Sequence, residues 1–302
     1  MPPNLESHRE PSPSSPSDSE PLIGVRRRML DKILRHRDVD LGVVSTMLLD
    51  LNPERAEDFL DRILEIDPKA SDDRKSKALF EILGEHSSHT VPHCKDTGDI
   101  VKRLMEHQGN SALAQADLAH LSRVIERHDF GKLCMCASTL NQEHKQFDDH
   151  QEREKKAHPY LGYLLMKVLR FKDSLGGRLA LTHHLKYQTG KDGDVQIVGY
   201  PKEDFSEYCR KNGLAHELTA EDQITSFVDV YSALTDASRP SDPFGMKKNP
   251  NVSPAERVKM ALGKMDQIFS DPYYQEGDGA PLFQAFKKAI LAADGHPQRL
   301  AA

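Results

Sequence analysis

Apolar residues recur at helical spacing along most of this 302-residue chain, and this pattern constrains the fold more than any other feature. A typical segment is 54–66, which has apolar residues at helical spacing: Phe59, Leu60, Ile63, Leu64 and Ile66. Only the segment 194–201, DVQIVGYP, is β-prone, and it lies in a Gly-rich loop that allows a short β-hairpin. Strand signals are too few for an α/β sheet, so the sequence predicts an all-α fold.

Three regions differ in composition. Residues 1–23 are rich in Pro, Ser and Glu and cannot bury enough apolar surface to order themselves, so we predict a disordered tail. Residues 24–84 contain several helical patterns and are predicted to form a helical N-terminal region. Residues 85–295 consist of helical patterns joined by junctions that carry histidine, and we expect the chemistry to lie there.

Composition excludes several classes of protein. The net charge of −6 argues against a general binder of nucleic acids or membrane surfaces, which would have a basic excess. The longest apolar stretch, 160–169, is shorter than the roughly 20 residues that span a bilayer. The first residues are polar and Pro-rich, unlike a secretory signal. We therefore expect a cytoplasmic protein without membrane contact.

The four cysteines do not form a recognisable metal motif. Only Cys134 and Cys136 are close in sequence, and their spacing is not that of a zinc ribbon. They follow a His-Asp pair and could approach a metal, but a small buried apolar role is the favoured interpretation.

The chain has 15 histidines, and their placement is more informative than their number. Histidine and aspartate occur together at helix ends or inside apolar segments: His89 and His93, His128 and Asp129, His158, His183 and His184, and Asp229. A lone histidine on an apolar face is usually a packed core residue. Asp229 is harder to explain in this way, because a buried carboxylate inside an apolar helix needs a cation or hydrogen-bond donors.

The adjacent pair His128-Asp129 favours a site with more than one ion. Neighbours on a helix point about 100° apart, so His128 can bind one ion while the Asp129 carboxylate bridges to a second. Imidazole and carboxylate ligands suit Zn, Fe, Mn and related divalent ions. Ligands gathered from several helices are typical of the core of a helical bundle.

The order of these residues resembles the HD superfamily of metal-dependent phosphohydrolases, and within it the HD-GYP branch, over residues 85–290. Five segments carry the resemblance: HDFGK at 128–132, HPYLG at 158–162, the His pair at 183–184, GYP at 199–201 and DVYSALTDASRP at 229–240. Asp192-Gly193 also matches the DG that precedes GYP in this branch. Three departures concern the substrate rather than the metal set: Leu185 stands in place of Glu, residues 194–198 separate the DG from the GYP, and Ser238 stands in place of Asp.

The resemblance implies an HD-domain helical bundle that holds two or three divalent ions, with Fe or Mn favoured over Zn, Ni or Co. It implies this ligand set: His89, His93, His128, Asp129, His158, His183, His184 and Asp229. The resemblance also implies the activity, which is hydrolysis of a phosphodiester by a metal-activated hydroxide. The most direct substrate is a cyclic dinucleotide such as cyclic di-GMP. The first ligand is open among Glu85, His86, His89 and His93. His93 has the nearest spacing to His128, Pro92 argues against a regular helix there, and we predict His89 and His93 with Glu85 in reserve.

Four residues are predicted to act on the substrate. Asp129 would bridge the ions and orient or deprotonate the attacking water. Lys132 lies one helical turn from the His-Asp pair and would hold a phosphate oxygen, and Arg239 would make a bidentate phosphate contact. Tyr200 would shape the substrate loop.

Other functions remain open at this point. One is a nucleotide phosphatase of the HD superfamily. Another is a catalytically inactive HD-type signalling module that binds a protein partner through residues 24–84. A homodimer is compatible with either.

Overall fold

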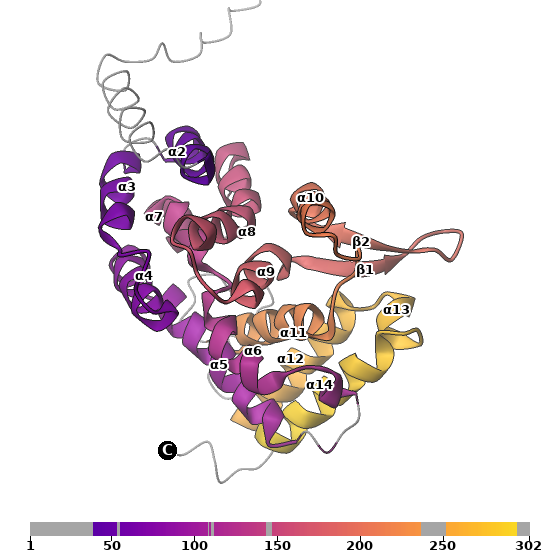
Figure 1. Cartoon of the computed structure of the whole chain (residues 1–302). Helices are drawn as coiled ribbons and strands as arrows, with labels where there is room; N and C mark the ends of the chain where they lie inside the picture. The colour runs from indigo at the N-terminus through magenta and orange to yellow at the C-terminus, as the bar shows by residue number, and fades with distance from the viewer. Residues whose placement is uncertain are drawn as a thin grey trace, which may run out of the picture.

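The computed structural model describes residues 39–52, 55–107, 109, 112–142, 147–236 and 252–294. Within these residues the fold is all-α with one two-stranded sheet, which confirms the predicted fold class and the hairpin (Figure 1). The predicted tail, the first part of the 24–84 region and Arg239 lie outside the described residues. No helix in the described ranges is long and apolar enough to cross a membrane.

The first helices of the described chain pack against the middle of the molecule. They are α2 (Val39–Leu51), α3 (Ala56–Glu65) and α4 (Asp72–His86). Their buried residues share one core with the short helix η3 (Phe130–Cys134) and with α8 (Asp149–Val168). Figure 1 shows α2 beside α8. The N-terminal helices and the segment that carries the His-Asp pair are therefore joined by apolar packing. The protein partner and the homodimer that the sequence allowed stay predictions.

Helix α5 (Thr90–Met105) corrects one expectation about the first ligand. Pro92 was expected to interrupt a helix here, but it lies in the first turn, where the missing N–H of proline has no intrahelical acceptor to lose. His93 therefore belongs to a regular helix, and His89 is the residue just before it.

The chain then forms short elements around the His-Asp pair. They are η1 (Leu113–Gln115), α6 (Leu118–Val124), η2 (Ile125–Arg127), η3 and α7 (Ala137–Asn141). Gly131 in η3 lies directly against α8, because a Cβ atom at this position would overlap the carbonyl oxygen of His158. Only a glycine permits this approach.

The hairpin follows α9 (Ser174–Thr182). Its strands β1 (Leu185–Thr189) and β2 (Val195–Gly199) are antiparallel, with Leu185 opposite Gly199 and Thr189 opposite Val195. Most of the extra segment that separates DG from GYP in the sequence forms β2. Tyr200 follows directly after this strand and leads into α10 (Lys202–Asn212).

The remaining helices complete a second core. Helix α11 (Ala220–Thr235) is buried along most of its length and begins with a capping box between Thr219 and Asp222. It packs with α5, α6 and the last helices: α12 (Pro254–Ile268), α13 (Pro272–Gln275) and α14 (Ala280–Asp294). Asp229 and His93 thus reach the site from neighbouring buried helices.

Candidate metal centre

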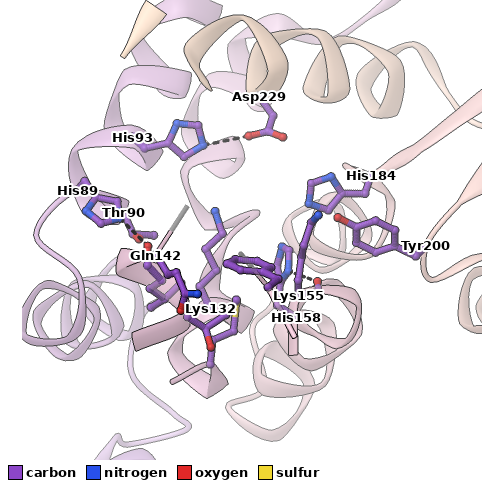
Figure 2. A pocket seen from close by; sticks show the side chains of 14 residues that line it. His89, Thr90, His93, Lys132, Gln142, Lys155, His158, His184, Tyr200 and Asp229 are labelled. Carbon is purple, nitrogen blue, oxygen red and sulfur yellow. Dashed lines mark hydrogen bonds and ion pairs between the residues drawn. The ribbon is translucent and has the colours of Figure 1, made fainter. Parts of the chain in front are cut away.

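Two groups of three side chains meet near the centre of the molecule. In each group the potential ligand atoms lie within 4.8 Å of one another. The first, the carboxylate triad, consists of His93, His128 and Asp229. The second, the histidine triad, consists of His158, His183 and His184. Figure 2 shows two residues of each triad, with His93 and Asp229 opposite His158 and His184.

Asp129 lies between the two triads and is only 1% exposed. Its Oδ2 atom is 3.4 Å from His128 Nε2 and 3.6 Å from His93 Nε2. Its Oδ1 atom is 3.4 Å from His158 Nε2 and 3.7 Å from His183 Nε2. One carboxylate oxygen therefore faces each triad, which is the arrangement that a bridging ligand requires.

Three of the rings are oriented by their own backbone. Each contacts the carbonyl oxygen three residues earlier through Nδ1: His128 to Ile125 at 2.8 Å, His158 to Lys155 at 2.6 Å and His183 to Ala180 at 2.9 Å. A carbonyl oxygen only accepts hydrogen bonds, so Nδ1 carries the proton in each ring. The lone pair is then on Nε2, which is the nitrogen that faces Asp129.

His93 is oriented in a different way. Its Nδ1 atom is 2.9 Å from Ser232 Oγ, and this hydroxyl donates to Asp96 Oδ2 at 2.7 Å. Because the hydroxyl proton is used by Asp96, Ser232 accepts the Nδ1 proton of His93. The Nε2 atom of His93 then faces Asp229 Oδ1 at 3.0 Å.

The buried ring nitrogens need a cation. His158 Nε2 and His183 Nε2 lie 3.1 Å apart although both carry lone pairs. His128 Nε2 is fully buried and has no hydrogen-bond partner among the described residues. Buried acceptors without donors are costly, and a divalent ion would satisfy each of them. The donor set therefore fits divalent metals.

In the histidine triad the pKa values favour the neutral rings that bind metals. Burial lowers the pKa of His158, and burial together with neighbouring histidine charge lowers the pKa of His183 to about 3 and that of His184 well below its usual value. Burial would also lower the pKa of His128, but the charges of Asp129 and Asp229 outweigh it and raise this pKa. The histidine triad is therefore neutral near neutral pH.

Both carboxyl groups are held as anions. Burial alone would raise their pKa values. Lys132 and His128 outweigh this effect at Asp129, and His128 and His93 do so at Asp229, so that both pKa values lie well below the usual range. Two buried carboxylates beside the neutral imidazoles of the histidine triad are a suitable ligand set for hard or borderline divalent ions.

A cavity of about 100 Å³ opens beside the triads. Lys132 lines this cavity (Figure 2). Its Nζ atom contacts Asp129 Oδ2 at 2.5 Å. Tyr200 and Lys155 line the same cavity, and the Tyr200 ring is 4.7 Å from the ring of His184, centroid to centroid. Burial raises the pKa of Tyr200, so its phenol stays protonated and can donate.

The other candidates for the first ligand lie apart from the triads. His89 is in the cavity wall, where its Nε2 is 3.1 Å from the carbonyl oxygen of Leu140. His86 is buried against Arg55 and the carbonyl oxygen of Met135, and the exposed Glu85 pairs with Arg62 at 2.7 Å. The structure therefore brings together every predicted ligand except His89.

Sequence reasoning did not identify Ser232, Asp96 or Lys155. A signal was present for the first two, because Ser232 lies three residues after Asp229 and Asp96 lies three after His93. Residues at this spacing share one face of a helix.

Comparison with known proteins gives a limited result. No protein-family model matches the chain, and no curated protein matches it. Two solved structures of the HD domain of the L. monocytogenes phosphodiesterase PgpH resemble it in fold, one of them in complex with cyclic-di-AMP. They are 14% and 13% identical in sequence, with TM-scores of 0.45 and 0.46. Both alignments cover 71% of this chain, and 94% and 95% of the respective PgpH chains.

Proposed function

We propose that this chain is a metal-dependent phosphohydrolase of the HD superfamily that cleaves a phosphodiester, most simply a cyclic dinucleotide such as cyclic di-GMP. The observation that carries the proposal is the position of Asp129, with one carboxylate oxygen facing each of two buried triads. The sequence order of these residues, which resembles the HD-GYP branch, supports the same activity.

The two triads and Asp129 would hold two divalent ions. His93, His128 and Asp229 would bind one, and His158, His183 and His184 the other. Fe and Mn suit this set, as do Zn, Ni and Co. Ions bound here would polarise a phosphate oxygen and lower the pKa of a water molecule.

The protein groups around the ions would position the reacting atoms. Asp129 would bind both ions and accept a hydrogen bond from the attacking water, because its pKa is held far below neutral pH. The Lys132 ammonium, now on Asp129 Oδ2, would bind a non-bridging phosphate oxygen. Arg239 is proposed as a second phosphate ligand.

The cavity residues would bind the rest of the substrate. Lys155 adds a second positive charge to the same cavity, and the Tyr200 phenol offers a neutral donor beside His184. Phe147 also lines the cavity and offers an aromatic face on which a nucleobase can stack. These features favour a nucleotide over an uncharged ester.

The test compares wild type with Asp129→Ala after both are loaded with Mn²⁺ or Fe²⁺. Cyclic di-GMP, cyclic di-AMP, their linear dinucleotides and a nucleoside monophosphate are incubated with each, and products are separated by chromatography. Asp99→Ala is the matched control, because Asp99 is an exposed aspartate on α5 paired with Lys102. We expect wild type and the control to open a cyclic dinucleotide, and Asp129→Ala to lose roughly 10³-fold or more in rate.

Other outcomes would select the alternatives. Release of phosphate from the monophosphate alone would indicate a nucleotide phosphatase. Bound metal with no turnover of any substrate would contradict hydrolysis and indicate a binding module.

A further inference from the structure

A third group of potential metal ligands shares no residue with the two triads or Asp129. It consists of Cys136, His150 and Glu154, whose ligand atoms all lie within 4.8 Å of one another. Cys136 is the residue before α7, and the other two lie one turn apart near the start of α8. None of the three has a part in the proposed hydrolysis.

Glu154 gives independent evidence that this group binds a cation. Its carboxylate is completely buried, and in the described chain the only basic side chain within ion-pair distance is His150, with Nε2 at 3.8 Å from Oε1. Its remaining contacts are neutral donors: the Cys136 backbone N–H at 3.0 Å and the Thr139 hydroxyl. A buried carboxylate is costly without a positive partner, and a metal ion supplies that charge.

The carbonyl oxygen at the end of α2 belongs to the same group. Leu51 O is 2.8 Å from His150 Nε2 and 3.8 Å from Cys136 Sγ. Together with the ligand atoms of Cys136, His150 and Glu154, this oxygen makes four potential metal ligands. It comes from a different part of the chain. Four such atoms match the number that a tetrahedral ion takes.

We propose that Cys136, His150 and Glu154 bind one Zn²⁺ ion, with the Leu51 carbonyl oxygen or a water molecule as the fourth ligand. Thiolate, imidazole and carboxylate are the ligands that zinc uses in proteins, and thiolate disfavours Mg²⁺ and Ca²⁺. Binding would replace the proton that His150 shares with Leu51 and the thiol proton of Cys136 by the metal.

The position of this zinc site gives it a structural role. It joins the end of α2 to α7 and to the start of α8, so it connects the N-terminal helices to the part of the chain that holds the triads. His158 of the histidine triad lies four residues after Glu154 on α8, about 6 Å further along the axis. Loss of zinc would therefore loosen α2 and the support of His158, without removing a ligand from either triad.

The test uses Co²⁺ as the probe, because cobalt bound to a thiolate shows a charge-transfer absorption that histidine and carboxylate ligands do not produce. Neither triad contains a cysteine, so this absorption reports on the third site alone. The full chain is freed of metal with a chelator and titrated with Co²⁺, as wild type and as Asp129→Ala. We expect the absorption to saturate in both, and an excess of Zn²⁺ over all three groups to abolish it.

Variants assign the absorption to these residues. Cys136→Ser should remove it, and His150→Gln should weaken Co²⁺ binding at this site by 10-fold or more, whereas Cys134→Ala, the neighbouring cysteine, should keep it. His150 is partly exposed, so its variant tests the site even if Cys136→Ser does not fold, which circular dichroism would reveal. Absence of the absorption in wild type, or its persistence at full strength in Cys136→Ser or His150→Gln, would overturn the proposal. Hydrolysis can fail in Asp129→Ala while this absorption persists, so the two proposals are tested separately.

Discussion

The two triads on either side of Asp129 use the same imidazole chemistry but have different charges. The carboxylate triad contains its own anion, Asp229, which helps to raise the pKa of His128. The histidine triad has no anion of its own and depends on Asp129 Oδ1 for negative charge. Burial lowers the pKa values of all three rings, and repulsion from neighbouring histidines lowers those of His183 and His184 further. Among the described side chains, an ion in the histidine triad would therefore be balanced by Asp129 alone, whereas an ion in the carboxylate triad would share its charge with both Asp129 and Asp229.

The triads also differ in what holds their rings. Backbone carbonyls of the same segment fix His158 and His183, so these orientations are local. His93 is fixed by Ser232 and Asp96, and Ser232 belongs to a different helix from His93. The geometry of the carboxylate triad thus depends on the packing of α5 against α11.

Among changes that separate the two triads, the largest expected effect comes from removing one ligand of each triad in turn. His183→Ala should empty the histidine triad and His93→Ala the carboxylate triad, with each variant keeping the other ion. Either change should lower the hydrolytic rate by roughly 10²-fold or more, since part of the charge stabilisation by metal is lost. Elemental analysis would show one ion fewer per chain in each.

His89→Ala is the matched control, because His89 lines the cavity but contacts Leu140 rather than a triad. Its metal content should equal that of wild type. If it loses an ion, His89 is a ligand as first predicted from the sequence. If His183→Ala and His93→Ala both lose every ion, the triads do not act as separate half-sites.

A smaller effect is expected from Ser232→Ala. The substitution removes the acceptor of the His93 Nδ1 proton, and loss of such a supporting contact weakens metal affinity by about 10- to 100-fold. Only the ion of the carboxylate triad should be affected. Competition with a fluorescent chelator would measure both affinities, and equal weakening at both triads would contradict the separation of the two supports.

The stability of the metal-free protein should depend on pH. The contributions of His183, in the histidine triad, and His128, in the carboxylate triad, should change with pH in opposite directions. The pKa of His183 falls from 6.5 when unfolded to about 3, so the unfolded chain binds more protons between these values. Its contribution to stability is complete above about pH 6.5 and is lost as pH falls. His128 has a raised pKa, so its contribution is complete below about pH 6.5 and is lost as pH rises through that pKa.

Thermal midpoints measured with excess chelator at about pH 5 and pH 7 test this difference. His183→Gln should reduce the loss of stability in acid, and His128→Gln should increase it. Parallel pH profiles for the two variants would show that the triads respond to protons in the same way.

The smallest expected effect is that of Glu85→Ala. Glu85 is exposed and paired with Arg62, and the described structure places it outside both triads. Metal content and hydrolytic rate should stay at the wild-type level. A lost ion would instead restore Glu85 to the ligand set.

Local sequence signals predicted the all-α fold, the hairpin and most of the candidate ligands. Helical periodicity is a local property of the sequence. The order of the His and Asp residues along the chain likewise identifies candidate ligands without knowledge of their positions in space. The partition into two triads could not be predicted, because it depends on which oxygen of Asp129 faces which helix. Likewise, Pro92 gave the wrong expectation for α5, since its effect depends on whether it lies in the first turn or in the interior.

The contact of Gly131 with the His158 carbonyl has a consequence for how the site tolerates change. The segment that carries Asp129 and the helix that carries His158 touch through backbone atoms, with no side chain between them. The spacing between Asp129 and His158 therefore depends on this backbone contact. At this contact even a methyl group on residue 131 would overlap the His158 carbonyl oxygen. Gly131 is therefore the residue whose small size keeps the segment of Asp129 close to the helix of His158.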